Sequence, residues 1–278
     1  MPELPAVERA RRLAQRVARG RRITRVYCAR DAIVFDGAGP ARIRKALTGR
    51  TVRAARRWGK HIWLELDRRP WPCFHFGMTG GFRVRGVPPL KLIMGPPTDG
   101  PEWPPRFTKI RLWLSGGREL IMTNTRRLGR IRLRDDPRHE PPISNLGFDP
   151  LLDLPTAAWL AAKLAARAAP IKAVLLDQSF AAGVGNWIAD EVLYQARIDP
   201  RTRARSLAGT AVRRLRSRLK HVIETAVEAD GISADFPKRW LFHHRWGRNH
   251  DAVTARGERI EHITIAGRTT AWVPEVQS

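Results

Sequence analysis

The chain has 278 residues, enough for two domains that each bury a hydrophobic core. Its 51 Lys and Arg residues against 26 Asp and Glu residues give a formal net charge of +25, which makes nucleic acid the leading candidate partner. Two cysteines, Cys28 and Cys73, are too few for a disulfide framework or a four-cysteine zinc site, and they favour a reducing compartment.

The first residues favour neither export nor a membrane anchor. Charged residues follow the N-terminus without an apolar core segment, and no apolar run approaches the ~20 residues of a membrane-spanning helix. We therefore expect a soluble, intracellular protein that has no membrane partner.

The opening segment, Met1-Pro2-Glu3-Leu4-Pro5, contains a candidate nucleophile. Removal of Met1 would leave the secondary amine of Pro2 beside the carboxylate of Glu3. An α-amino group has a pKa of ~8 against ~10.4 for lysine, so roughly a tenth of it is free amine at pH 7. Such an amine can form a Schiff base with an electrophilic carbon. The same residues also fit an ordinary chain start, with Pro5 in the first turn of a helix.

A helix followed by many strands is predicted for the N-terminal half. Val7, Ala10, Leu13, Ala14 and Val17 have helical spacing, and Gly20 can end that helix. A second, short helix is predicted near residues 41–47. Strands are predicted at 23–27, 32–35, 51–66, 74–84, 109–114, 119–122 and 131–133, with a hairpin turn at Gly116-Gly117. Two packed sheets are the natural arrangement of these strands.

A change of composition divides the chain. Five prolines fall within residues 135–155, which predicts a linker. Helical patterns continue from there to about Glu228, including an apolar stripe of Val212, Leu215, Leu219, Val222, Ile223, Ala226 and Val227. We predict an α+β protein with a catalytic domain over 1–134, a linker over 135–155, a helical domain over 156–235 and a C-terminal segment over 236–278.

A glycine-containing turn lies between two predicted helices of the second half. Lys172 lies in the first helix, and the turn around Gly183 and Gly185 leads to Asn186, which can cap the second helix. Asp190 and Glu191 lie near the positive end of that helix. The amides at such a helix start suit a phosphate, although a glycine-rich turn also fits a purely structural role.

Five motifs together resemble the formamidopyrimidine-DNA glycosylases. They are Met1 to Pro5, Arg57-Trp58-Gly59-Lys60, His75-Phe76-Gly77-Met78, Arg126-Arg127-Leu128-Gly129, and Gly183 to Glu191. The stretch from Gly185 to Ile198 and the ending Gly267 to Ala271 are most similar to the plant and fungal branch. The resemblance covers almost the whole chain. It implies an N-terminal β-sandwich with flanking helices, a helix-two-turn-helix domain and a β-hairpin finger, in a base-excision repair enzyme.

The resemblance also implies roles for individual residues. Pro2 would attack the sugar carbon C1′ that carries a damaged base, Glu3 would move protons, and Lys60 would act with them at the catalytic centre. The base must first leave the stack. Met78, Arg126 and Leu128 would fill the vacated space, and the DNA contacts would come from Lys60, His75, Lys172, Asn186 and Arg268. Without the resemblance, Met78 fits a core residue, His75 a buried strand histidine and Lys60 a solvated turn.

The C-terminal segment departs from relatives whose hairpin binds zinc through four cysteines. The corresponding places hold residues 252–255 (Ala-Val-Thr-Ala) and 273–276 (Val-Pro-Glu-Val), and the histidines at 243, 244, 250 and 262 have no standard zinc spacing. We predict a zincless finger with strands around 259–265 and 269–273 that presents Arg268 to DNA. We expect no metal and no cofactor.

Three other departures bear on the substrate. Ala6 stands where the family usually has glutamate, Leu128 replaces an aromatic residue, and the connection from Glu228 to Trp240 is short. We expect a bifunctional glycosylase and lyase that removes formamidopyrimidines and hydantoins, with 8-oxoguanine less favoured, followed by β,δ-elimination. The expected partner is double-stranded DNA with oxidised bases or abasic sites, and we expect a monomer in the nucleoid of a bacterium or the nucleus of a eukaryote.

Two rival functions remain open. One is a catalytically impaired protein that keeps the fold and binds damaged DNA, which the loss of a carboxylate at Ala6 keeps in view. The other is a general basic nucleic-acid-binding protein without preference for a lesion. All three would lose affinity for DNA as the salt concentration rises, so salt dependence does not separate them.

Overall fold

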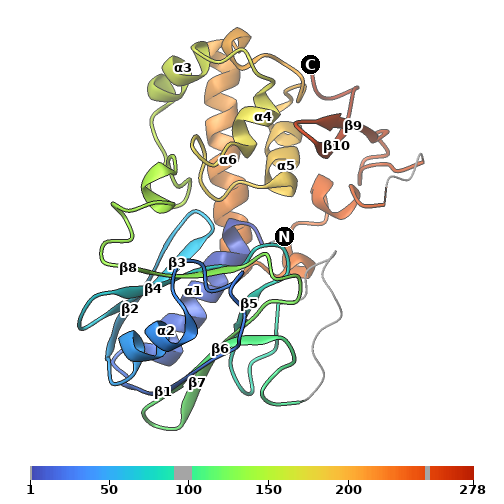
Figure 1. The fold of residues 1–278 in the computed structure, drawn as a ribbon. Coiled ribbons are helices and arrows are strands. Elements are labelled where there is room, and N and C mark those ends of the chain that lie inside the picture. The colour runs from blue at the N-terminus through green and yellow to red at the C-terminus, as the bar shows by residue number, and fades with distance from the viewer. Residues whose placement is uncertain (1, 91–101, 248–250) are drawn as a thin grey trace. The chain divides into compact units, whose positions relative to one another are not determined.

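Residues 2–90, 102–247 and 251–278 are described by the computed structural model, which divides into two compact units (Figure 1). The first unit comprises Met1–Asn145 with Asp230–Ser233, and the second comprises Leu146–Ala229 with Ala234–Ser278. The predicted linker is therefore split between the units, and the predicted finger segment belongs to the helical unit. Backbone bonds explain the split, because Gly147 donates to the carbonyl of Gln178 at 2.9 Å and Ala182 donates to that of Phe148 at 2.9 Å.

Two four-stranded antiparallel sheets form the first unit, as the strand pattern predicts. One sheet has the order β1 (Ile23–Cys28), β6 (Thr108–Leu114), β7 (Arg118–Thr123), β5 (Gly81–Arg83). The other has the order β2 (Val52–Trp58), β3 (His61–Leu66), β4 (Trp71–His75), β8 (Arg130–Arg134). Residues of both sheets share one hydrophobic core with α1 (Leu4–Ala18) and α2 (Pro40–Leu47). This packing confirms the predicted sandwich with flanking helices.

Three strand predictions in this unit are wrong. The predicted strand at 51–66 is the antiparallel pair β2 and β3, joined by a turn at Gly59 and Lys60 in which Gly59 has a φ of 55°. The predicted strand at residues 32–35 is a turn, because the Asp31 carboxylate accepts the N–H of Val34 at 3.3 Å and the Asp31 carbonyl accepts that of Phe35 at 3.0 Å. The predicted strand at 74–84 is broken after His75. Gly77 there has a φ of 60°, a left-handed conformation that the extended chain of a strand does not allow.

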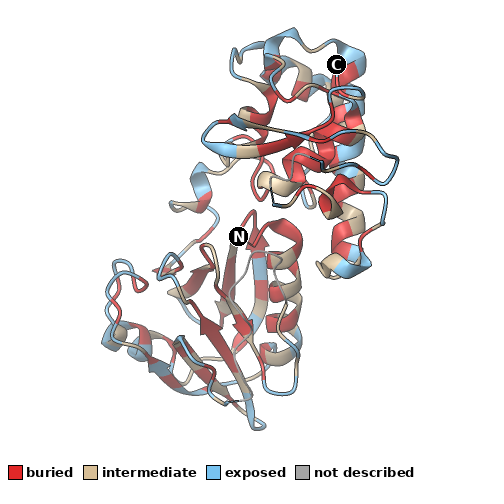
Figure 2. Cartoon of the chain, turned by 90° about the vertical axis from the view of Figure 1, so that its right-hand side faces the viewer, coloured by how far each residue is buried: buried red, intermediate tan, exposed pale blue. Residues whose placement is uncertain are grey.

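Helices dominate the second unit, and a hairpin completes it (Figure 1). The helices are α3 (Ala157–Ala165), α4 (Ile171–Leu176), α5 (Asn186–Ala196) and α6 (Gly209–Glu228), with short 3-10 turns at Ile143–Asn145 in the first unit and at Ala204–Ser206, Ser233–Asp235 and Leu241–His243. The strands are β9 (Glu261–Ile265) and β10 (Arg268–Trp272). All seven residues of the predicted α6 stripe are buried, as the red faces of Figure 2 illustrate for the helices generally.

Candidate active site and nucleic-acid interface

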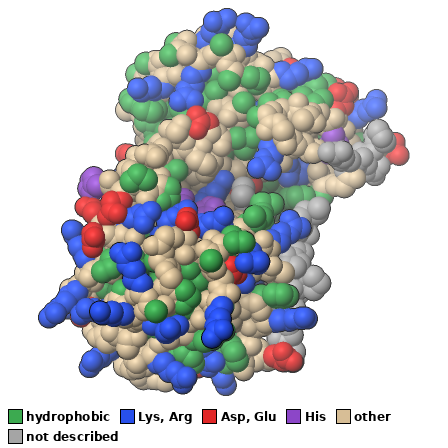
Figure 3. All heavy atoms as spheres, in the orientation of Figure 1, with side chains coloured by type: hydrophobic (Ala, Val, Ile, Leu, Met, Phe, Trp, Pro, Cys, Tyr) green, Lys and Arg blue, Asp and Glu red, His purple; other side chains and the backbone are tan. Residues whose placement is uncertain are grey.

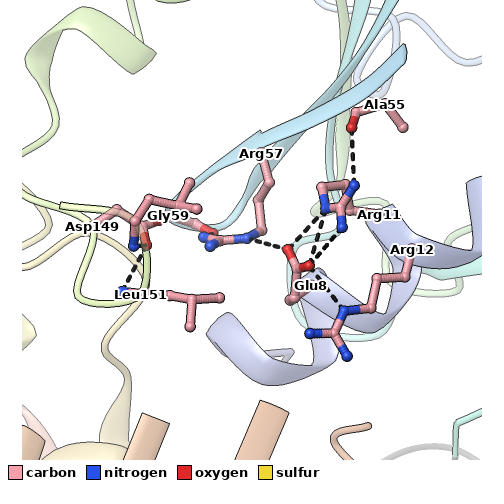
Figure 4. Close-up of polar contacts among 9 residues, drawn as sticks. Glu8, Arg11, Arg12, Ala55, Arg57, Gly59, Asp149 and Leu151 are labelled. Carbon is pink, nitrogen blue, oxygen red and sulfur yellow. Dashed lines mark hydrogen bonds and ion pairs between the residues drawn. The ribbon is translucent and has the colours of Figure 1, made fainter. Parts of the chain in front are cut away.

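The start of the chain is anchored to the first unit. Pro2 and Glu3 are both buried, and α1 begins directly after them. The Glu8 carboxylate accepts hydrogen bonds from Arg57 Nε at 3.0 Å and from Arg11, while Arg57 also donates to the carbonyl of Gly59 at 3.0 Å (Figure 4). The first turns of α1 are thereby tied to the β2–β3 turn that carries Lys60.

The charge state of Glu8 suits this anchoring role. Burial raises the pKa of Glu8, but its hydrogen bonds and charge contacts with Arg11 and Arg57 outweigh that effect and hold the pKa below its ordinary value. Glu8 therefore stays ionised, and the anchor persists across the neutral range of pH.

His75 lies where β4 ends, next to the turn that carries Lys60. The two sheet strands pair His75 with His61, and their ring centroids lie 4.7 Å apart. Burial is the main cause that lowers the pKa of His75 to about 4, and the charges of Lys60 and Arg132 lower it further. The backbone N–H of Gly77 donates to His75 Nδ1 at 3.3 Å. In the neutral ring the proton then resides on Nε2, which leaves a neutral donor.

The predicted void-filling residues lie on two segments that contact each other. Met78 is half-buried in the turn after β4, and Arg126 and Leu128 are exposed in the loop between β7 and β8. A Cβ atom at Gly77 would lie 2.4 Å from the carbonyl carbon of Leu128, so only glycine fits between the two segments. The buried Asn124 side chain also joins them, because it donates to the carbonyl of Phe76 at 2.9 Å and accepts the N–H of Gly129 at 3.0 Å.

Lys172 lies in the interior of the second unit. Its side chain is fully buried, with Nζ 2.5 Å from Asp190 Oδ1 and 2.7 Å from Thr270 Oγ1. Asp190 Oδ2 meanwhile accepts hydrogen bonds from Arg245 at 2.5 Å and from the N–H of Ala271 at 3.1 Å. Lys172 therefore links β10 to α5, and its predicted contact with DNA stays a prediction.

Asn186 begins α5 but does not cap it through its side chain. The N-cap residue is Gly185, and the Asn186 side-chain amide donates to the carbonyl of Thr269 in the hairpin at 2.8 Å. The preceding turn is held by the Gln178 side chain, which donates to the carbonyl of Val184 at 2.8 Å and accepts the N–H of Gly183 at 3.1 Å. The hydrogen bond from Asn186 to Thr269 therefore links the start of α5 to the hairpin within the second unit.

Arg268 is exposed at the turn of the hairpin, and its contact with DNA stays a prediction. Ala266 and Gly267 have φ values of 49° and 68° between the paired residues Ile265 and Arg268, which is typical of a two-residue turn, and Arg268 is exposed. Its apolar residues pack in a cluster formed by Tyr194, Leu241, Ile260, Ala271 and Val273 with Ala252 and Val276. Residues of 252–255 and 273–276, where the zincless finger was predicted, thus contribute to an apolar core.

Hydrogen bonds close the base of this segment. The Glu258 carboxylate accepts from the hydroxyl groups of Tyr194 and Thr254, both at 2.7 Å. His243 and His262 contact backbone carbonyls, and His250 lies outside the described residues. Within residues 2–90, 102–247 and 251–278, no group of three or more His, Cys, Asp or Glu side chains is arranged to hold a metal ion.

Three carboxylates and one arginine that form buried or part-buried contacts lie outside the five motifs: Glu8, Asp31, Glu258 and Arg245. The sequence shows Asp190 only as a charge near a helix start, and it gives no sign of the partners that come from 55 and 81 residues away.

Lys and Arg side chains are spread over the visible surface of each unit, with fewer acidic ones (Figure 3). No helix among the described residues is long and apolar enough to cross a membrane.

The buried Glu191 of α5, which accepts hydrogen bonds from Gln195 and from the N–H of Phe242, makes the stability of the second unit depend on pH. Burial is the main cause that raises the pKa of Glu191 to about 7, and the charge of Asp190 adds to it. Because the folded pKa exceeds the unfolded one, the stabilising effect is complete below about pH 4.5 and is lost as pH rises through 7. Glu191→Gln is expected to match the wild type at about pH 4.5 and to be more stable at about pH 8, by on the order of 3 kcal/mol.

Urea unfolding at both pH values measures this difference. The half-exposed Glu224, which faces Lys220 across 3.8 Å, supplies the control Glu224→Gln, for which we expect no such divergence. If the difference in stability between Glu191→Gln and the wild type were the same at both pH values, the raised pKa of Glu191 would be contradicted.

Comparison with known proteins supports the same architecture. The model of the formamidopyrimidine-DNA glycosylase N-terminal domain matches residues 1–131, and the model of the H2TH domain matches residues 146–238. The chain is 44% identical over 277 residues to formamidopyrimidine-DNA glycosylase of Arabidopsis thaliana, covering 100% of this chain and 71% of that protein. It is 34% identical over 294 residues to a Thermus thermophilus protein of the same name, covering 100% of this chain and 98% of that protein.

Solved structures share the fold. The Lactococcus lactis formamidopyrimidine-DNA glycosylase bound to DNA with an abasic site matches with a TM-score of 0.81 and 24% identity, covering 99% of each chain. The same protein in complex with DNA containing FAPY-dG matches with a TM-score of 0.80 and 24% identity. With both domain models matched and a relative 44% identical over the whole chain, this protein belongs to the formamidopyrimidine-DNA glycosylase family.

Proposed function

We propose that this protein is a base-excision repair enzyme that removes oxidised purines from double-stranded DNA and then cleaves the strand at the abasic site. The observation that carries this proposal is the 44% identity to the Arabidopsis thaliana glycosylase over the full chain. The buried Pro2–Glu3 pair at the start of α1 supplies a chemically suitable nucleophile and acid/base group. The excess of positive charge supports a polyanionic partner.

The Pro2 amine would act after Met1 has been removed. Its nitrogen attacks C1′ of the extruded nucleotide, and the bond between sugar and base breaks with its electron pair leaving on the base. Glu3 carries the proton from the nitrogen to the ring oxygen O4′, which opens the sugar and leaves an iminium ion. Loss of a C2′ proton then expels the 3′ phosphate, and a second elimination expels the 5′ phosphate. Lys60 supports this centre electrostatically.

Contacts to phosphates would position the DNA without reading the base sequence. In the first unit Lys60 and His75 would supply them, and in the second unit Asn186 and Arg268 would supply them. Lys172 orients the hairpin that carries Arg268 through its contact with Thr270. Met78, Arg126 and Leu128 fill the space left by the base, with Leu128 acting as an apolar wedge.

A neutral His75 gives a testable salt signature. A neutral donor releases no counterion, so His75→Gln is expected to weaken binding to abasic-site DNA while leaving the slope of log Kobs against log salt unchanged. Lys60→Ala is expected to reduce that slope by about 0.9. Fluorescence anisotropy across a salt series near neutral pH measures both slopes. Equal slope changes in the two variants would show that His75 binds as a cation.

Excision rates on a lesion panel test the proposed activity. Duplexes with formamidopyrimidine, hydantoin or 8-oxoguanine are incubated with the protein, and borohydride trapping is run in parallel on duplexes with an abasic site. We expect formamidopyrimidine and hydantoin to be excised faster than 8-oxoguanine, together with a covalent adduct. Tight lesion binding without an adduct would instead support the impaired binding protein that the alanine at position 6 allows, and binding without lesion preference would support a general nucleic-acid-binding protein.

The remaining properties follow from this activity. We propose that the protein acts as a monomer, with neither cofactor nor metal, in the compartment that holds the genome. That compartment is the nucleoid in a bacterium and the nucleus in a eukaryote. Its DNA partner carries oxidised bases or abasic sites.

A further inference from the structure

We propose that Asp31 is a positioning residue for base excision, because it fixes the loop of Arg126 and Leu128 through their neighbour Arg127. The proposal rests on the proposed function, since it concerns how that loop enters the space left by the extruded base. Asp31 does not contact the nucleotide in this account. Its contribution is to hold the loop in an insertion-ready shape before DNA arrives.

A two-pronged contact joins Arg127 to Asp31. Arg127 Nε lies 3.2 and 3.1 Å from the two oxygens of the Asp31 carboxylate, and Nη2 lies 3.1 Å from Oδ1. The Asp31 side chain is only 4% exposed, whereas that of Arg127 is 52% exposed. An arginine with half of its side chain in solvent is therefore directed back to one buried carboxylate. Fork contacts of this kind fix orientation as well as distance.

The backbone explains why the contact matters for the loop. Arg127 has a φ of 55°, a left-handed conformation that is costly for a residue with a side chain. This conformation turns Arg127 toward Asp31 while Arg126 and Leu128 on either side remain exposed. Without the Asp31 contact, nothing described for the Arg127 side chain would favour that backbone state over the ordinary right-handed one.

Asp31 is itself rigidly held. Lys109 Nζ of β6 donates to Asp31 Oδ2 at 2.8 Å, and the N–H of Val34 donates to Oδ1 at 3.3 Å. Burial raises the pKa of Asp31, but the hydrogen bonds from Arg127 and Lys109 outweigh it and lower the pKa to about 2. The carboxylate therefore remains charged at any pH at which the enzyme would work, and the anchor does not switch.

Asp31 completes a set of anchors along this loop. Asn124 holds the C-terminal end at Gly129, the hydroxyl group of Thr79 accepts the N–H of Arg126 at 3.4 Å, and the backbone of Leu128 packs on Gly77. The other three anchors contact the backbone of the loop, whereas Asp31 contacts the side chain of Arg127 at its centre. A misplacement of about 1 Å can cost roughly 10²-fold in rate. Loss of the Asp31 contact should therefore slow base excision, which needs Leu128 correctly placed in the space left by the base.

The experiment compares Asp31→Asn with the matched control Asp36→Asn. Asp36 also pairs with an arginine of the same unit, Arg132 at 2.6 Å, but on the surface and away from Arg127. The readouts are single-turnover excision of formamidopyrimidine from a duplex and borohydride trapping on a single-stranded abasic oligonucleotide. The single strand has neither a base stack nor an opposite base, so trapping there needs Pro2 but no wedge.

We expect Asp31→Asn to slow duplex excision by about 10- to 100-fold while single-stranded trapping stays within about twofold of the wild type. Asp36→Asn should match the wild type in both assays. The proposal is overturned if Asp31→Asn equals Asp36→Asn on the duplex, or if it slows both assays to the same extent. A wild type that neither excises nor traps overturns the proposed function itself, which is a distinct result.

A second variant covers the case in which Asp31→Asn does not fold. Arg127→Ala changes a half-exposed side chain and removes the same contact from the other partner. It should show the same split between duplex and single strand. In the double variant the two losses should not add, because both remove one contact. Additive losses, or wild-type duplex rates in Arg127→Ala, would contradict the anchor.

Discussion

A protein whose terminal amine is blocked is expected to cleave abasic-site DNA slower than the mature wild type by roughly 10³-fold or more, because the covalent route is lost. Insertion of one leucine between Met1 and Pro2 prevents removal of the initiator methionine and puts an amide bond on the Pro2 nitrogen. The remaining chain, including the Glu8 anchor of α1, is unchanged. Strand cleavage in a single-turnover assay measures the loss.

The control for this prediction restores the amine in the same chain. A tag that a protease removes directly before Pro2 gives a blocked form before cleavage and a free terminus after it. Activity should return when the tag is removed. Equal cleavage rates in the blocked and freed forms would show that another group is the nucleophile.

Asp190→Ala is expected to destabilise the second unit by about 3–5 kcal/mol. The substitution removes the carboxylate between Lys172 and Arg245, whose side chains are 0% and 5% exposed, and so leaves two buried cations without their shared partner. It also removes the acceptor for the N–H of Ala271 in β10. Urea unfolding measures the change in the free energy of unfolding, and hydrogen exchange at the Ala271 amide reports on the hairpin.

A surface pair provides the comparison. Glu224→Ala removes the partner of Lys220 on α6, where both side chains are about half exposed, and it should change stability by less than about 1 kcal/mol. If Asp190→Ala were no more destabilising than Glu224→Ala, the buried charge cluster would not be what holds the hairpin to α5.

Local patterns were sufficient to predict most elements of the fold. The spacing of apolar residues predicts α1 and α6 because their buried faces follow the 3.6-residue period. The hairpin, which the resemblance implied, lies near its predicted position, and Arg268 is exposed directly after its two-residue turn. Alternation of aliphatic residues predicts β6, whose buried positions fall at every second residue from Ile110.

Errors arose where a side chain competes with the regular backbone pattern. Residues 32–35 have the apolar composition of a strand, but the Asp31 carboxylate captures the N–H of Val34 and forms a turn. The burial of Lys172 against Asp190 and Thr270 was likewise not predicted, while its contact with DNA, which the resemblance implies, stays a prediction. Both arrangements depend on partners that the sequence does not reveal.

The candidate site was also predicted only in part. The resemblance implies roles for Pro2, Glu3, Lys60, His75 and the residues proposed to fill the void, because each lies in a short motif that resembles the family's, and these roles stay predictions. The residues that hold these groups were not identified. Asp31 and Arg127 are 96 positions apart, and Asp190 and Arg245 are 55 apart, so only the folded chain shows that they meet.

Mass spectrometric mapping of the borohydride-trapped complex identifies the nucleophile. The protein is reacted with abasic-site DNA, reduced, digested with nuclease and protease, and the modified peptide is sequenced. We expect the sugar remnant on the nitrogen of Pro2, at the start of a chain lacking Met1. An adduct on a lysine side chain such as Lys60, or on a chain that keeps Met1, would contradict this expectation.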